Sequence, residues 1–122
     1  MFLPNLLGKE KENKYIMTAK KKSGTSRAIK VKSFLKELIP SYLENRKKDI
    51  REIRELILAK DYEQIKLLGH RMKGSGGGYG FDAISHCGCS IERGALEKNN
   101  ELIQDALLAL EDYLQNLKVV FE

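Results

Sequence analysis

Apolar residues recur every three or four positions along most of the chain after residue 32, which is the period of an amphipathic α-helix. The pattern predicts a short helix from Ser33 to Ile39 and a longer one from Pro40 to about Lys60, since proline is accepted in a first helical turn. The apolar stripe of the longer helix is Leu43, Ile50, Ile53, Leu56 and Ile57. No alternating pattern typical of a half-buried strand is found.

Three further helices are expected in the rest of the chain. Asp61 is a good N-cap for a helix that begins at Tyr62, and Asp82 is expected to cap another helix over residues 83–98. A last helix is expected over residues 101–120. The apolar positions of these last two helices are Ile84, Cys87, Ile91 and Ala95, then Ile103, Leu107, Leu110, Leu114, Leu117 and Phe121. Short connections between long helices predict an all-α fold, an antiparallel four-helix bundle with an additional short N-terminal helix.

The helix that begins at Tyr62 has two different faces at 100° per residue. The predicted core face is Tyr62, Ile65, Leu68, Gly69, Met72 and Gly76. A separate face carries Lys66, Leu67, His70, Lys73, Gly74 and Gly77. His70 is therefore expected to point outward, with Lys73 and Gly74 as its neighbours on the next turn. This position fits a solvated histidine or an accessible nucleophile for a phosphoryl group.

Five glycines crowd into seven residues directly after Lys73, namely Gly74, Gly76, Gly77, Gly78 and Gly80. Each glycine inside a helix costs roughly 1 kcal/mol relative to alanine, so either the helix ends near Lys73 or something must approach closely there. A phosphate-binding loop requires the lysine after its glycines, and a dinucleotide-binding loop requires a preceding strand. The sequence has neither arrangement.

These residues resemble the H-x-x-K-G-[ST] signature of histidine-containing phosphotransfer (HPt) domains of two-component phosphorelays. The signature corresponds to residues 70–75, followed by Gly80 at the end of the helix. The resemblance covers about residues 30 to 120. It includes Ile39-Pro40-Ser41-Tyr42-Leu43-Glu44-Asn45-Arg46, Tyr79-Gly80-Phe81, Cys87 and Ile91-Glu92.

The resemblance implies a role for each residue around the motif. His70 takes the position of the phosphoacceptor. Lys73 takes the position of the group that stabilises the charge of the phosphoryl group, and Gly74 takes the position that leaves space beside the imidazole. Glu92 takes a position from which a side chain of the next helix can hold the imidazole. Partner-docking residues are expected to be Lys66, Leu67 and Gly77, although an exposed Leu67 is also ordinary for a soluble protein.

The resemblance also implies partners and chemistry. The protein is expected to relay a phosphoryl group between a sensor histidine kinase or receiver aspartate and a response regulator. No ATP site is recognised, so it is expected to be a phosphorelay intermediate rather than an enzyme. It needs no cofactor or metal of its own, because Mg²⁺ belongs to the partner receiver domain. The alternative is a degenerate HPt-like bundle that acts only as a binding module or kinase inhibitor. An enzyme with its own substrate ranks lower, since no second acid or base is expected to point at His70.

The net charge of +5 is concentrated near the N-terminus. Residues 1–32 carry nine lysines and arginines against two glutamates, whereas residues 33–122 carry 13 against 15 acidic residues. We therefore expect residues 1–28 to be a basic, flexible segment and residues 29–122 to be the bundle. Such a tail is more often solubilising than nucleic-acid binding, and no nucleic-acid partner is expected. Met17 is an alternative start, which would make residues 1–16 an annotation artefact.

The two cysteines, Cys87 and Cys89, are too few for a disulfide framework, which favours a cytoplasmic protein. Two positions apart on a helix, they point about 160° away from each other, so no metal site is expected at His86-Cys87-Gly88-Cys89. No apolar run reaches the roughly 18 residues of a membrane span, and no signal peptide is recognised.

Overall fold

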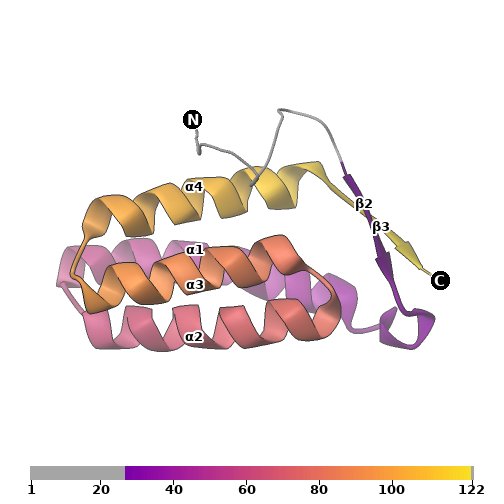
Figure 1. Cartoon of the computed structure of the whole chain (residues 1–122), viewed down its shortest axis with the longest axis horizontal. Coiled ribbons are helices and arrows are strands. Elements are labelled where there is room, and N and C mark those ends of the chain that lie inside the picture. Colours follow the sequence, from indigo (N-terminus) through magenta and orange to yellow (C-terminus); the bar gives the residue numbers. More distant parts are fainter. Residues whose placement is uncertain (1–26, 122) are drawn as a thin grey trace. The chain divides into compact units, whose positions relative to one another are not determined.

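The computed structural model describes residues 27–121, which form four α-helices, a 3₁₀ turn and two short strands (Figure 1). In chain order these are β2 (Arg27–Val31), η2 (Ser33–Leu35), α1 (Ile39–Ala59), α2 (Tyr62–Tyr79), α3 (Asp82–Leu96), α4 (Asn100–Asn116) and β3 (Leu117–Phe121). Consecutive helices run antiparallel (Figure 1), so the predicted all-α, four-helix bundle is confirmed. Most of the predicted basic segment, residues 1–26, lies outside the described residues, as does residue 122.

The ends of α2 show why the sequence folds this way locally. At its start, the backbone N–H of Gln64 donates to Oδ1 of Asp61 over 3.2 Å, so the predicted cap is confirmed. At its end, Gly80 has φ +90°, a left-handed conformation that glycine adopts without strain. The chain therefore reverses directly from α2 into α3.

The prediction that Asp82 caps the third helix, α3, is wrong. Asp82 is the first residue of α3, and Phe81 occupies the N-cap position without a side-chain cap. Phe81 is completely buried, and its backbone N–H donates to the Gly76 carbonyl over 2.7 Å. Burial of this ring fixes the start of the helix, and Asp82 adds a favourable charge to the first turn.

The core lies between the four helices, each of which contributes completely buried side chains. These include Ile53, Ile65, Met72, Ile84, Ile91, Ile103, Leu107 and Leu110. Burial of such side chains is the main stabilising contribution to the bundle. Several predicted core residues are only half-buried, namely Leu43, Leu56, Tyr62, Cys87 and Leu114. None of the helices within residues 27–121 is long and apolar enough to span a bilayer.

The two ends of the described chain differ from the prediction, which expected no strand and more helix. The expected helix from Ser33 to Ile39 is only a 3₁₀ turn, and the last helix ends at Asn116 rather than at Val120. The segment beyond Asn116 forms β3, which pairs with β2 in a two-stranded sheet. Its residues, Leu-Lys-Val-Val-Phe, include β-branched and aromatic side chains that favour strands, and their exposure alternates along the strand.

Candidate functional site

The helix α2 presents His70 on its outward face, as the sequence predicted. The side chain of His70 is 63% exposed, whereas Gly69 and Met72, one residue before it and two residues after it, are buried in the bundle. Lys73 follows on the next turn of the same face with a side chain that is 42% exposed. An imidazole and an ammonium are therefore both accessible at the middle of α2.

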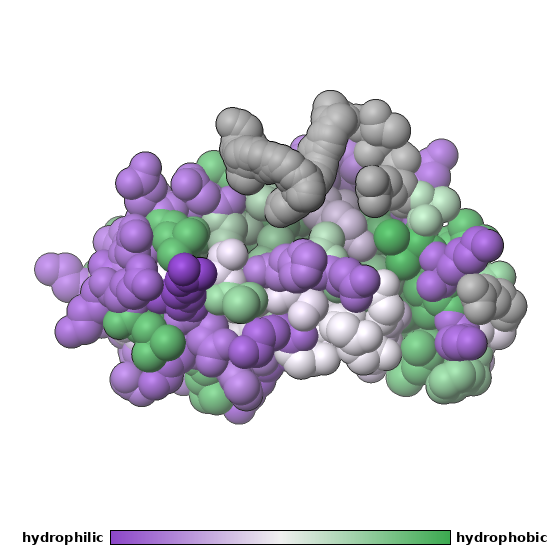
Figure 2. Space-filling view, in the orientation of Figure 1, coloured by the Kyte–Doolittle hydropathy of each residue, from purple (hydrophilic) through white to green (hydrophobic). Residues whose placement is uncertain are grey.

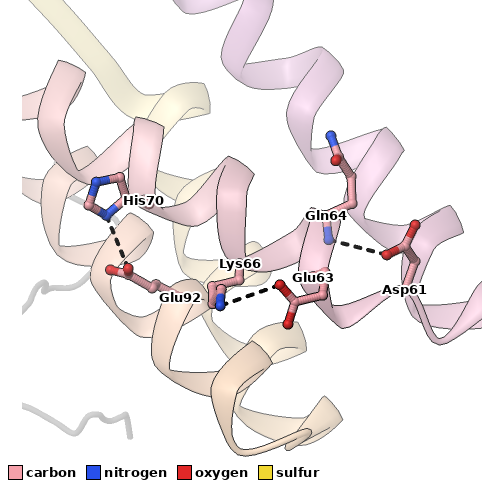
Figure 3. A network of polar contacts seen from close by, with 6 residues as sticks. All are labelled: Asp61, Glu63, Gln64, Lys66, His70 and Glu92. Atoms are coloured by element: carbon pink, nitrogen blue, oxygen red, sulfur yellow. Dashed lines mark hydrogen bonds and ion pairs between the residues drawn. The ribbon is translucent and has the colours of Figure 1, made fainter.

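Glu92 joins these two groups from α3. Its Oε2 lies 3.0 Å from Nδ1 of His70 (Figure 3), and its Oε1 lies 3.0 Å from Nζ of Lys73. The hydrogen bond from Lys73 holds the pKa of Glu92 below its ordinary value, and the same bond raises the pKa of Lys73. Both groups are therefore charged at neutral pH. The contact of Glu92 with His70 agrees with the position expected for it, whereas the ion pair with Lys73 was not predicted.

Close packing of α3 on α2 places Glu92 at this distance. A Cβ added to Gly69 would lie 2.7 Å from the backbone nitrogen of Glu92, and one added to Gly88 would collide with the backbone nitrogen of Lys73. Ser85 reinforces the contact, since its hydroxyl donates to the Lys73 carbonyl over 2.7 Å. Gly88 and Ser85 were missed by the sequence analysis. A glycine inside an otherwise regular helix was the available signal for Gly88.

We expect Gly88→Ala to destabilise the protein by about 1–2 kcal/mol. Alanine gains roughly 1 kcal/mol of helix propensity. Its Cβ would meet backbone atoms of α2 rather than a flexible side chain, so the cost of overpacking is in the upper part of the usual range, about 2–3 kcal/mol, and α3 shifts. Urea unfolding measures the difference. Gly78→Ala is the matched control, because a Cβ there meets nothing within 4 Å and should stabilise the helix. A Gly88→Ala protein as stable as the wild type would contradict this account of the α2–α3 contact.

Three glycines of the run form an open surface on α2, whereas Gly76 is buried. The helix continues through the run to Tyr79, so an end near Lys73 is excluded. Added Cβ atoms at Gly74, Gly77 and Gly78 would meet nothing within 4 Å. Figure 2 shows a pale area of intermediate hydropathy over the C-terminal half of α2. Toward the end of α2, the surface next to His70 therefore has no protruding side chains at these three glycines.

A shallow depression of about 510 Å³ lies on the other side of His70, toward the start of α2. Its lining includes Lys66, Leu67 and Glu92, and Lys66 forms an ion pair with Glu63 over 3.4 Å (Figure 3). Leu67 is 40% exposed. Two of the three expected docking residues thus lie at this depression, and Gly77 lies beyond His70 on the glycine side.

The cysteines of α3 are separate from this arrangement of charges. Both are free thiols; Cys89 is exposed and Cys87 is half-buried. Burial raises the pKa of the Cys87 thiol to about 12, so this thiol is protonated at neutral pH. Within residues 27–121, no three histidine, cysteine or acidic side chains are grouped to hold a metal ion.

The fold and the site define a helical bundle that presents an exposed histidine in contact with a carboxylate, which also pairs with a lysine. Comparison with known families matches residues 37–119 to the Hpt domain. The chain therefore belongs to the Hpt domain family, as the resemblance of residues 70–75 indicated. Domains of this family are phosphotransfer carriers without an ATP site of their own, and they interact with kinases and receiver domains of two-component systems. No curated protein and no solved structure matches the chain.

Proposed function

We propose that this protein relays a phosphoryl group through His70, from a sensor kinase or receiver aspartate to a response regulator. The observation that carries this proposal is the contact between Nδ1 of His70 and the Glu92 carboxylate. A carboxylate acceptor fixes the tautomer with the proton on Nδ1. Nε2 then carries the lone pair and points away from Glu92 (Figure 3), toward an incoming phosphoryl group.

The transfer step follows from this tautomer. The lone pair of Nε2 attacks phosphorus, the P–N bond forms, and the P–O bond to the partner's aspartate breaks with its electron pair leaving on the carboxylate. The proton stays on Nδ1, so the ring becomes positively charged and Glu92 balances that charge. In onward transfer an oxygen of the response regulator's aspartate attacks phosphorus, the new P–O bond forms, and the P–N bond breaks with its electron pair returning to Nε2. Such a step depends mainly on positioning and on neutralised charge.

The neighbouring residues support the same step. Lys73 stabilises the phosphoryl oxygens, and Gly74 leaves room for the partner's phosphorylated loop beside the imidazole. Lys66, Leu67 and Gly77 contact the partner on either side of His70. Mg²⁺ is supplied by the receiver domain, and we place the protein in the cytoplasm, which agrees with its two free thiols.

Direct phosphorylation tests the proposal. The purified protein is incubated with phosphoramidate, a small phosphoryl donor, and separately with phosphorylated receiver domains from the same genome. We expect one acid-labile, alkali-stable phosphoryl group per chain, located on His70 by mass spectrometry. Binding of a receiver without uptake from either donor would overturn the relay and favour the binding-module alternative.

We expect Lys73→Ala to slow phosphotransfer about tenfold, which corresponds to roughly 1.4 kcal/mol in the barrier. The substitution removes charge stabilisation from a half-exposed side chain, so unfolding free energy should change by no more than about 0.5 kcal/mol. Stopped-time labelling measures the rate of phosphotransfer, and urea unfolding of the same samples measures the free energy of unfolding. Lys47→Ala is the control, since it removes an exposed ammonium from α1 that pairs with Glu44. Lower stability with unchanged transfer would show that Lys73 is structural.

A further inference from the structure

One carboxylate engages two groups of the site at once. Glu92 uses one oxygen for Nδ1 of His70 and the other for Nζ of Lys73, each over 3.0 Å. Its side chain is only 21% exposed, less than that of either partner. In the unphosphorylated protein, the ammonium that the proposed function assigns to the phosphoryl group is therefore already occupied.

We propose that Glu92 competes with the phosphoryl group for Lys73, so that Lys73 changes partner when His70 is phosphorylated. This inference rests on the proposed function. Glu92 then slows phosphoryl uptake and also orients the imidazole. The competition reduces the free energy by which Lys73 stabilises phosphorylated His70, and it thereby favours onward transfer of the phosphoryl group.

The charges of the two states support an exchange of partners. Before phosphorylation, Glu92 is balanced by the Lys73 ammonium, and the imidazole form that attacks phosphorus through Nε2 carries no charge. Afterwards the ring of His70 is positive and faces the same carboxylate through Nδ1–H, so Glu92 keeps a cationic partner when Lys73 leaves. The phosphoryl group gains the ammonium, which lies one helical turn from His70 on the same face. The flexible four-carbon stem of lysine permits this movement without a change in the backbone.

Glu92→Gln separates the two functions of this residue. The amide oxygen can still accept a hydrogen bond from Nδ1, but the charge that holds Lys73 is gone. Lys73→Ala removes the group for which Glu92 and the phosphoryl group compete. Glu63→Gln is the matched control, because it removes a carboxylate from α2 that pairs with Lys66 rather than with Lys73.

The test is a double-mutant cycle of Glu92→Gln and Lys73→Ala, with the initial rate of His70 phosphorylation by phosphoramidate as the readout. In each background we compare the rate with and without Glu92→Gln. We expect the ratio of the Glu92→Gln rate to the Glu92 rate to be larger when Lys73 is present than in the Lys73→Ala background. The ratio of the two effects should be about threefold to fivefold, the size of one exposed ion pair. Glu63→Gln should leave the rate unchanged in both backgrounds.

Equal effects in both backgrounds would show that Glu92 acts only on the imidazole, and a ratio below one would show that it positions Lys73 productively. Either result overturns the competition while leaving the relay through His70 intact. Absence of phosphoryl uptake on His70 in every variant overturns both proposals. A second readout is the side-chain ammonium resonance of Lys73 by nitrogen-15 NMR. This signal should shift on phosphorylation of the wild-type protein, and an unchanged signal contradicts the exchange.

Discussion

A His70→Gln protein will take up no phosphoryl group, whether the donor is phosphoramidate or a phosphorylated receiver domain. Glutamine has no nucleophilic ring nitrogen, and His86, the other histidine of the described residues, lies on α3 and has Cys89 rather than a lysine three residues on. Because the His70 side chain is 63% exposed, we expect the unfolding free energy to change by no more than about 0.5 kcal/mol. Radiolabelling and urea unfolding measure the two properties.

His86→Gln is the matched control for this loss, since His86 is also exposed but lies on α3 outside the site. It should accept phosphoryl groups at the wild-type rate. Label that persists in the His70→Gln protein, or label lost from the His86→Gln protein, would place the phosphoacceptor elsewhere.

Gly74→Leu will block transfer from a receiver domain while the bundle stays folded. A side chain at residue 74 points into open space, so the substitution replaces a poor helix former with a good one and should stabilise the helix by up to about 1 kcal/mol. The same side chain fills the space beside the imidazole that a partner must enter. We expect a loss of at least about tenfold in receiver-dependent transfer, a smaller loss in uptake from phosphoramidate, and a weaker effect for Gly77→Leu.

Gly76→Leu provides the contrast, because a Cβ at residue 76 would lie 2.6 Å from the backbone nitrogen of Ser85. That protein should lose stability and transfer together. If Gly74→Leu behaved in the same way, with transfer falling only as the folded fraction falls, the glycine would be structural and the docking interpretation would be wrong.

Local signals in the sequence were sufficient for most of the helical architecture and for the orientation of α2. The side-chain oxygen of Asp61 and the periodic burial of Ile65, Leu68 and Met72 act within one or two turns, so they can be recognised without knowledge of the rest of the fold. The same periodicity placed His70 and Lys73 on the outward face. Family membership then follows from a short motif in the helical context that it requires.

Features that depend on distant parts of the chain were missed. Leu117 and Phe121 continue the helical spacing of α4, but pairing with β2 makes this segment a strand. Pairing of this kind joins residues far apart in sequence, and a local pattern does not contain it. The ion pair between Lys73 and Glu92 was missed for the same reason, because it requires the close approach of two helices at Gly88.

The glycines of α2 have a consequence for the order in which the protein acquires its site. Four glycines between residues 74 and 78 cost the helix about 4 kcal/mol relative to alanine, so this half of α2 is held in shape by α3 rather than by its own propensity. During synthesis α2 leaves the ribosome before α3. The signature residues are therefore present in the nascent chain well before they form a helix. We therefore expect a partner that recognises the folded surface around His70 to bind only after Leu96 has emerged and α3 has docked, so that unfinished chains would not be phosphorylated.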